Sequence, residues 1–154
     1  MSQTLEQVDF GVRQTLAKYC FLLDEQRISE MTSVFVRGCV VDFVPGLTLR
    51  GVDEVISHLE ERVLALKASS HHISNTVIEM VGEDDVRAVS YLYAWHHFHE
   101  DRPDGIVWGR YVDRLRHFDG EWLLTERKIV IHGMEGMDVE AMHELERGSG
   151  SGGR

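Results

Sequence analysis

The run SSHHISNTVI, residues 69–78, places two histidines and an asparagine at the start of an apolar, β-branched segment. From this run onward the chain has the two-residue period of strands rather than the period of helices. Side chains alternate between the faces of a strand, so His71 and Asn75 are expected on one face and His72 on the other. A histidine that faces a partly apolar cavity needs a partner to orient its ring, and Asp24 is the carboxylate we expect to supply it.

The sequence before this run predicts helices interrupted by a hairpin. Thr4 and Gln7 form a capping-box pattern ahead of apolar residues at helical spacing, which predicts a helix ending near residue 23. A short helix is expected over residues 28–35 and a third helix over residues 51–67. Between them, residues 39–44 and 47–50 predict two strands joined by a Pro-Gly turn.

The sequence after residue 69 predicts four long strands, over residues 69–82, 86–100, 106–118 and 121–133. Short stretches of turn residues separate them, which indicates an antiparallel meander. A chain in which helices come first and a meander follows is typical of an α+β fold, in which helices cover one face of a curved sheet. Strands of this length favour bulges and strong coiling, so a pocket is expected between sheet and helix. A short acidic helix is expected over residues 139–147.

Length and composition indicate one domain of ordinary globular type. We place this domain at residues 1–147 and a flexible Gly/Ser-rich tail at residues 148–154. The 26 acidic and 16 basic residues give a formal net charge of −10, which disfavours nucleic acid and anionic membranes as partners. Cys20 and Cys39 lack a CxxC spacing and are expected to be buried thiols. With no signal-peptide pattern and no membrane-spanning apolar run, a cytoplasmic location is expected.

Short motifs follow one another through the chain to about Gly133. They are Tyr19 with Leu22-Leu23-Asp24, Gly46 with Gly51, His71-His72-Ile73-Ser74-Asn75, Ser90-Tyr91 with His96, Gly109-Arg110-Tyr111-Val112-Asp113, and Asp119-Gly120-x-Trp122 with Arg127. In order and spacing they resemble the SnoaL-like branch of the nuclear transport factor 2-like superfamily. The resemblance implies a cystatin-like cone, a strongly curved and mostly antiparallel sheet wrapped around N-terminal helices.

The resemblance also implies a class of chemistry. The branch includes scytalone dehydratase, a bile acid dehydratase and hexachlorocyclohexane dehydrochlorinase, which eliminate a small leaving group from a cyclic substrate. In these relatives an aspartate at the end of the first helix pairs with a histidine early in the third strand, and Asp24 and His71 match those positions. Scytalone dehydratase uses a second histidine on the next strand, for which His96 is the matching position and His97 the alternative.

Four residues are expected to contact a substrate. Leu23 and Phe43 occupy the positions where scytalone dehydratase has two water-holding tyrosines, so that enzyme's own substrate is not expected here, and Phe43 would offer an apolar contact. The resemblance places Tyr111 in the pocket, where its hydroxyl would stabilise a substrate oxygen or pair with backbone. Tyr19 is expected near the pocket mouth, and Asn75 would bind substrate or satisfy a bend.

The expected chemistry is proton transfer. If Asp24 accepts a hydrogen bond from one ring nitrogen of His71, the other nitrogen is left as a base, suited to removing a proton beside a carbonyl or across from a leaving group. The alternative is a buried pair with a structural role only. His96 is the second acid/base candidate, with a polar lining role as its alternative.

The remaining features concern partners and metals. Tyr91, Tyr93 and Trp95 share the strand face away from His96, and we expect a homodimer or higher homo-oligomer to bury this face. The histidines do not combine with a carboxylate at a known zinc or iron spacing, so no metal is expected. No Gly-rich phosphate loop is present, so no cofactor is expected either.

The sequence therefore predicts a cofactor-independent lyase of the dehydratase type, or an isomerase. Its substrate would be a small, largely apolar, cyclic hydroxylated or carbonyl compound. Two alternatives stay open: a non-catalytic small-ligand-binding protein of the same fold, or the small subunit of a ring-hydroxylating dioxygenase.

Overall fold

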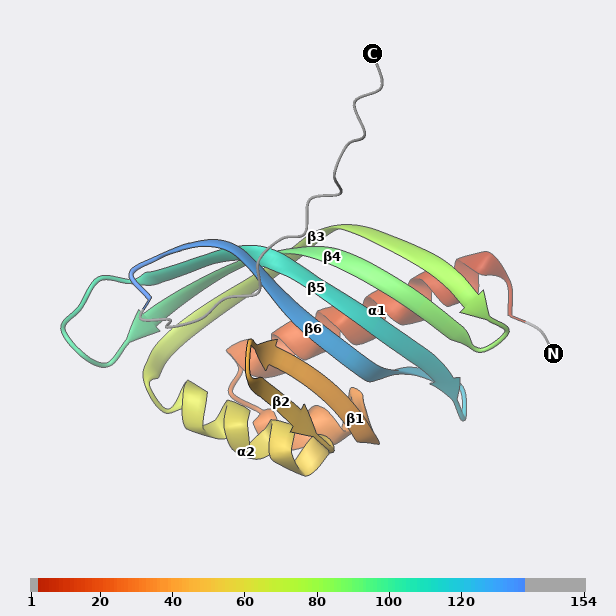
Figure 1. Cartoon of the computed structure of the whole chain (residues 1–154), viewed down its shortest axis with the longest axis horizontal. Helices are drawn as coiled ribbons and strands as arrows, with labels where there is room; N and C mark the ends of the chain where they lie inside the picture. Colours follow the sequence, from red (N-terminus) through yellow and green to blue (C-terminus); the bar gives the residue numbers. More distant parts are fainter. Residues whose placement is uncertain (1–2, 138–154) are drawn as a thin grey trace, which may run out of the picture.

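The computed structural model describes residues 3–137, which form two α-helices, one 3₁₀ helix and six strands (Figure 1). In chain order the elements are α1 (Leu5–Asp24), η1 (Ile28–Ser33), β1 (Phe35–Val44), β2 (Leu47–Arg50), α2 (Val52–Val63), β3 (Leu66–Gly82), β4 (Asp85–Phe98), β5 (Gly105–Phe118) and β6 (Glu121–Glu135). The expected α+β class is confirmed. The helix expected over residues 139–147 and the expected tail lie outside the described residues.

All strands belong to one sheet in the order β2-β1-β6-β5-β4-β3. Strands β3 to β6 form the expected antiparallel meander, and β1 and β2 form the expected hairpin. A parallel pairing of β1 with β6, which the sequence analysis did not predict, joins the hairpin to the meander. Figure 1 shows the long strands arching over α1, while α2 lies beside β1 and β2.

Some boundaries differ from those expected from sequence. Strand β1 begins at Phe35 rather than at residue 39, because Phe35 pairs with Leu124 of β6. Helix α2 ends at Val63 rather than near residue 67, because Leu66 already pairs with Phe98 in the sheet. In both cases a strand partner distant in sequence overrides the local helical pattern.

Helix α1 is fixed by its N-terminal cap and by its core contacts, and its C-terminal residue is Asp24. Its capping box is present, with the Gln7 backbone N–H donating to Thr4 Oγ1 at 3.2 Å and the Thr4 N–H to Gln7 Oε1 at 2.9 Å. Its apolar stripe, including Val12 and Leu16, is buried in the core beneath the sheet. The helix therefore ends with Asp24 held close to the edge strand β3.

Two expectations about the whole chain can be compared with the described residues. Cys20 and Cys39 are both buried and free of disulfide bonds, as expected. Neither helix within residues 3–137 combines the length and the apolar character that a membrane crossing requires.

Candidate active site

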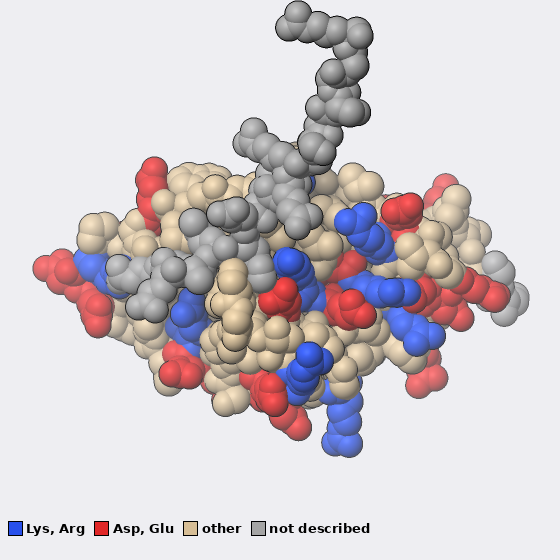
Figure 2. Space-filling view, in the orientation of Figure 1, with Lys and Arg blue, Asp and Glu red and all other residues tan. Residues whose placement is uncertain are grey.

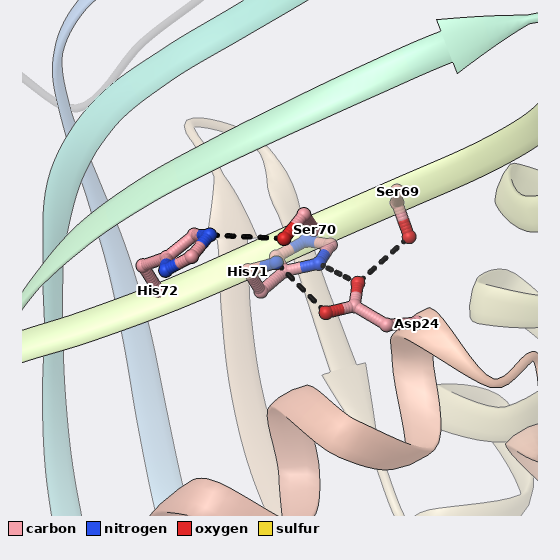
Figure 3. A network of polar contacts seen from close by, with 5 residues as sticks. All are labelled: Asp24, Ser69, Ser70, His71 and His72. Carbon is pink, nitrogen blue, oxygen red and sulfur yellow. Dashed lines mark hydrogen bonds and ion pairs between the residues drawn. The ribbon is translucent and has the colours of Figure 1, made fainter.

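Asp24 and His71 meet where α1 ends against β3 (Figure 3). His71 Nδ1 lies 2.7 Å from Asp24 Oδ1, and the backbone N–H of His71 donates to Asp24 Oδ2 at 2.8 Å. The Ser69 hydroxyl donates to Asp24 Oδ1 at 2.8 Å. Because β3 is an edge strand, a carboxylate can reach a backbone N–H that has no partner strand on that side. The aspartate therefore fixes both the strand and the ring.

The hydrogen bonds to Asp24 favour its ionised form. Burial alone raises the pKa of this carboxyl, but the donors on His71 and Ser69 outweigh burial and hold the pKa below its usual value. When the His71 ring is neutral, an ionised Asp24 accepts from its Nδ1–H, which leaves Nε2 without the proton. Only 10% of the His71 side chain is exposed, so this nitrogen lies in a partly dry environment.

His71 opens onto a cavity of about 410 Å³ between the inner face of the sheet and the two α-helices. Most of the lining side chains are apolar and include Leu23, Leu59, Leu92, Val107, Ile129 and Ile131. The polar lining residues are few: His58, Arg62, His71, His96 and the two tyrosines Tyr19 and Tyr111. A largely apolar pocket with a few convergent polar groups is typical of small-molecule sites.

His96, rather than His97, faces this cavity. In the β3–β4 register Ser69 lies opposite His96 and His71 opposite Ala94, which puts the two histidines on the same face. Their ring centroids are 5.3 Å apart with the planes nearly perpendicular. His97 points to the other face, where its Nδ1 lies 2.7 Å from Asp104 Oδ1.

The surroundings of His96 keep its ring neutral. Burial, followed by the influence of His71, lowers its pKa to about 4. Its Nδ1 is buried and has no hydrogen-bond partner among the described residues. A neutral imidazole beside a second imidazole can exchange a hydrogen bond with a ligand, but it does not store a proton at neutral pH.

Tyr19 and Tyr111 both line the cavity and contact each other edge to face, with ring centroids 5.8 Å apart. The guanidinium carbon of Arg127 lies 4.1 Å from the centroid of the Tyr19 ring and 4.0 Å from that of Tyr111. Arg127 in turn makes a buried, two-pronged ion pair with Asp113, at 2.7 and 2.8 Å. Burial raises the pKa of both tyrosines, so both hydroxyls stay protonated and able to donate.

Of the other two residues expected to contact a substrate, Phe43 lines the cavity and Asn75 does not. Phe43 lines the cavity and packs against His58, with ring centroids 4.6 Å apart. Asn75 is exposed and is not among the lining residues. Its backbone has a φ of 49°, within a break in the β3–β4 register between Ser74 and Val77. The strict alternation that placed Asn75 beside His71 does not hold through this bulge.

The sequence analysis missed two polar lining residues, His58 and Arg62, both on α2. The helical pattern puts Arg62 on the same polar face as Glu60 and Glu61, and this residue is exposed although it also lines the cavity. The signal that would have found the pair is its spacing, because residues four apart lie above one another on a helix. Within residues 3–137, no cluster of three or more His, Cys, Asp or Glu side chains has a geometry suited to a metal ion.

Comparisons with known proteins identify the domain family and similar folds. A SnoaL-like domain model matches residues 9–128. The structure resembles a candidate scytalone dehydratase from Novosphingobium aromaticivorans, with 28% identity, a TM-score of 0.87 and coverage of 92% of this chain and 96% of that one. A protein from Kribbella flavida has 18% identity and a TM-score of 0.80, over 86% of this chain and 95% of that one.

A hexachlorocyclohexane dehydrochlorinase from Novosphingobium barchaimii has the same fold at 12% identity. Its TM-score is 0.75, over 90% of this chain and 95% of that one. No curated protein matches the sequence.

Proposed function

This chain belongs to the SnoaL-like domain family, and we propose that it is a cofactor-independent lyase of the dehydratase type, or an isomerase with the same proton-abstraction step. Its substrate would be a small, largely apolar, cyclic hydroxylated or carbonyl compound. His71 would be the general base, Asp24 the residue that orients it, and His96, Tyr19 and Tyr111 the groups that hold substrate oxygens.

One observation carries the proposal: a histidine in the wall of a mostly apolar cavity is held through Nδ1 by an ionised aspartate. Here Asp24 also binds the His71 backbone N–H and the Ser69 hydroxyl, which fixes the ring direction while Nε2 stays available to the cavity. Positioned bases of this kind speed proton transfer by about 10²–10⁴-fold.

In the proposed elimination, His71 Nε2 takes a proton from the carbon next to the carbon that bears the hydroxyl. The C–H electron pair becomes the new double bond, and the C–O bond breaks with its electrons on oxygen. The departing oxygen takes a proton back from the imidazolium of His71 and leaves as water, so the enzyme returns to its starting state. Asp24 stabilises the imidazolium while it carries the proton.

The remaining polar groups of the cavity would act on substrate oxygens. The hydroxyls of Tyr19 and Tyr111 stay protonated, so each can donate a hydrogen bond to a carbonyl on which negative charge develops. Neutral His96 can donate to the departing oxygen from the next strand. In an isomerase the same proton would return to a different carbon of the substrate.

The experiment is a screen of cyclic hydroxy-ketones for loss of water, with wild type and three variants. We expect His71→Ala to lower kcat by about 10²–10⁴-fold, the contribution of a positioned base, and Asp24→Asn by about a hundredfold or more, because an amide no longer fixes the tautomer. His72→Ala is the matched control, since this ring lies on the other side of β3 and bonds to Ser70 (Figure 3).

Two results would count against the proposal. Equal rates for wild type and His71→Ala would remove His71 from the mechanism. Tight binding of these compounds by the wild type, with no turnover of any, is the result expected of the non-catalytic binding protein instead.

A further inference from the structure

We propose that His58 and Arg62 form a carboxylate-binding subsite on the α2 wall of the cavity. This inference rests on the proposed function. The substrate whose reacting carbon faces His71 would also carry a carboxylate that reaches α2. The proposal thus narrows the substrate class to cyclic carboxylic acids.

The first support is an unsatisfied polar atom. His58 Nε2 is buried, and it has no hydrogen-bond partner among residues 3–137, although the residue lines the cavity. A buried polar atom without a partner destabilises the folded protein. A ligand oxygen placed at this wall would remove that destabilisation.

The second support is the charge on Arg62. This residue lies one helical turn after His58 and also lines the cavity, with its guanidinium carbon 5.8 Å from the centroid of the Phe43 ring. Within residues 3–137 it makes no ion pair, whereas four other arginines do: Arg13, Arg27, Arg114 and Arg127. The positive charge of Arg62 thus remains available to a ligand.

The third support is that the charge of Arg62 influences other groups of the cavity. Burial lowers the pKa of His58 most and Arg62 lowers it next, and Arg62 adds a smaller lowering at His96 after burial and His71, so its charge reaches two of the imidazoles that line the cavity. A ligand carboxylate beside Arg62 would therefore lie within the same hollow as the reacting groups.

The donor set favours a carboxylate over a phosphate. The α2 wall offers one full positive charge, on Arg62, beside a neutral His58 whose pKa burial lowers further. The Phe43 ring contacts both side chains. One guanidinium and one imidazole match the two oxygens of a planar monoanion.

The experiment measures binding rather than turnover. Naphthoate and its neutral isostere naphthamide are titrated calorimetrically into wild type, Arg62→Gln, His58→Phe and Arg37→Gln. Arg37 is exposed on β1 outside the cavity and controls for the loss of one positive charge.

We expect wild type to bind naphthoate more tightly than naphthamide. Arg62→Gln should weaken naphthoate binding by about tenfold, as for a single charge-assisted hydrogen bond, and leave naphthamide nearly unchanged. His58→Phe keeps a ring beside Phe43 and should also weaken naphthoate selectively. Arg37→Gln should bind both probes like wild type.

Two results would overturn the subsite. One is a wild type without preference for the carboxylate, including one that binds neither probe. The other is an equal loss in Arg62→Gln and Arg37→Gln, which would be an effect of net charge. His71→Ala should still bind naphthoate, so failure of the proposed elimination and failure of the subsite are distinguishable.

Discussion

At the scale of single residues, the two cavity histidines differ because their partners differ. His71 is bonded to the ionised Asp24, whereas His96 is buried without a carboxylate and has a pKa of about 4. With ring centroids 5.3 Å apart, a charge on one ring disfavours a charge on the other. The pair therefore carries at most one positive charge during a reaction cycle, and His71 is the ring placed to carry it.

The depressed pKa of His96 predicts a pH dependence of stability. Between its ordinary value of 6.5 and about 4, the unfolded chain binds this proton and the folded chain does not, so stability falls as pH falls through that window. The loss should reach about 3 kcal/mol at the lower end, since each pKa unit corresponds to about 1.4 kcal/mol. Urea unfolding of wild type and His96→Asn across these pH values measures it.

His96→Asn should be less stable than wild type near neutral pH, because it loses the packing of the ring. It should also lack the dependence of stability on pH that the titration of His96 produces. Identical slopes for wild type and His96→Asn would show that folding does not lower the pKa of His96.

The sequence predicts these residues unevenly. Strand alternation separated His71 from His72, and the small residues on one face of β4 favoured His96 over His97. The partnership of Asp24 with His71 came from the family resemblance, because no local pattern links residues 47 positions apart. His58 and Arg62 were missed because the packing of α2 against the sheet decides which part of its polar face meets the cavity.

At the scale of elements, β3 carries His71 of the candidate site and also contains a bulge, beyond which its side chains no longer face the cavity in regular alternation. Before the bulge the strand alternates regularly, so Ser69 and His71 share one face. Ser69 donates to Asp24, and His71 lines the cavity. At Asn75 the backbone enters the left-handed region and the register shifts. Asparagine tolerates this conformation better than most residues, which is reason enough for its presence here.

This conformation predicts different effects of two substitutions at Asn75. Asn75→Val should lower the free energy of unfolding by about 1–2 kcal/mol, because a β-branched residue is strained at positive φ. Asn75→Gly should be close to neutral, because glycine adopts this conformation freely. Urea unfolding measures both. An unchanged stability together with a loss of ligand binding in Asn75→Gly would instead make Asn75 a substrate contact.

Most elements were predictable because their signals are local. Turn residues separate the long strands, and the capping box marks the start of α1. The parallel pairing of β1 with β6 was not predictable in this way, since it joins residues such as Val41 and Arg127 that are far apart in the sequence. The same pairing explains why β1 begins earlier than its β-branched run.

At the scale of the whole molecule, the outer face of the sheet exposes a row of aromatic residues. Tyr91, Tyr93 and Trp108 are 42%, 40% and 39% exposed, and the rings of Tyr93 and Trp108 contact each other. Arg110 lies over the Tyr91 ring and donates to its hydroxyl. Figure 2 shows acidic and basic side chains interspersed on the face that it presents. Clustered aromatic residues are typical of protein interfaces.

We propose that a homodimer or higher homo-oligomer buries this outer face. Tyr93→Glu should shift the protein to monomers, because it places a charge in the centre of the contact. Sedimentation analysis over a range of concentrations measures the effect. Phe10→Glu is the matched control, since Phe10 is an exposed aromatic residue on α1. A wild type that sediments as a monomer throughout would contradict the proposal.

The account depends on which nitrogen of His71 carries the proton, and nitrogen NMR of the ring measures this directly. At neutral pH we predict the proton on Nδ1, bonded to Asp24, with Nε2 bare, and a loss of this preference in Asp24→Asn. A wild-type ring protonated on Nε2 would leave no base facing the cavity and would contradict the proposed chemistry.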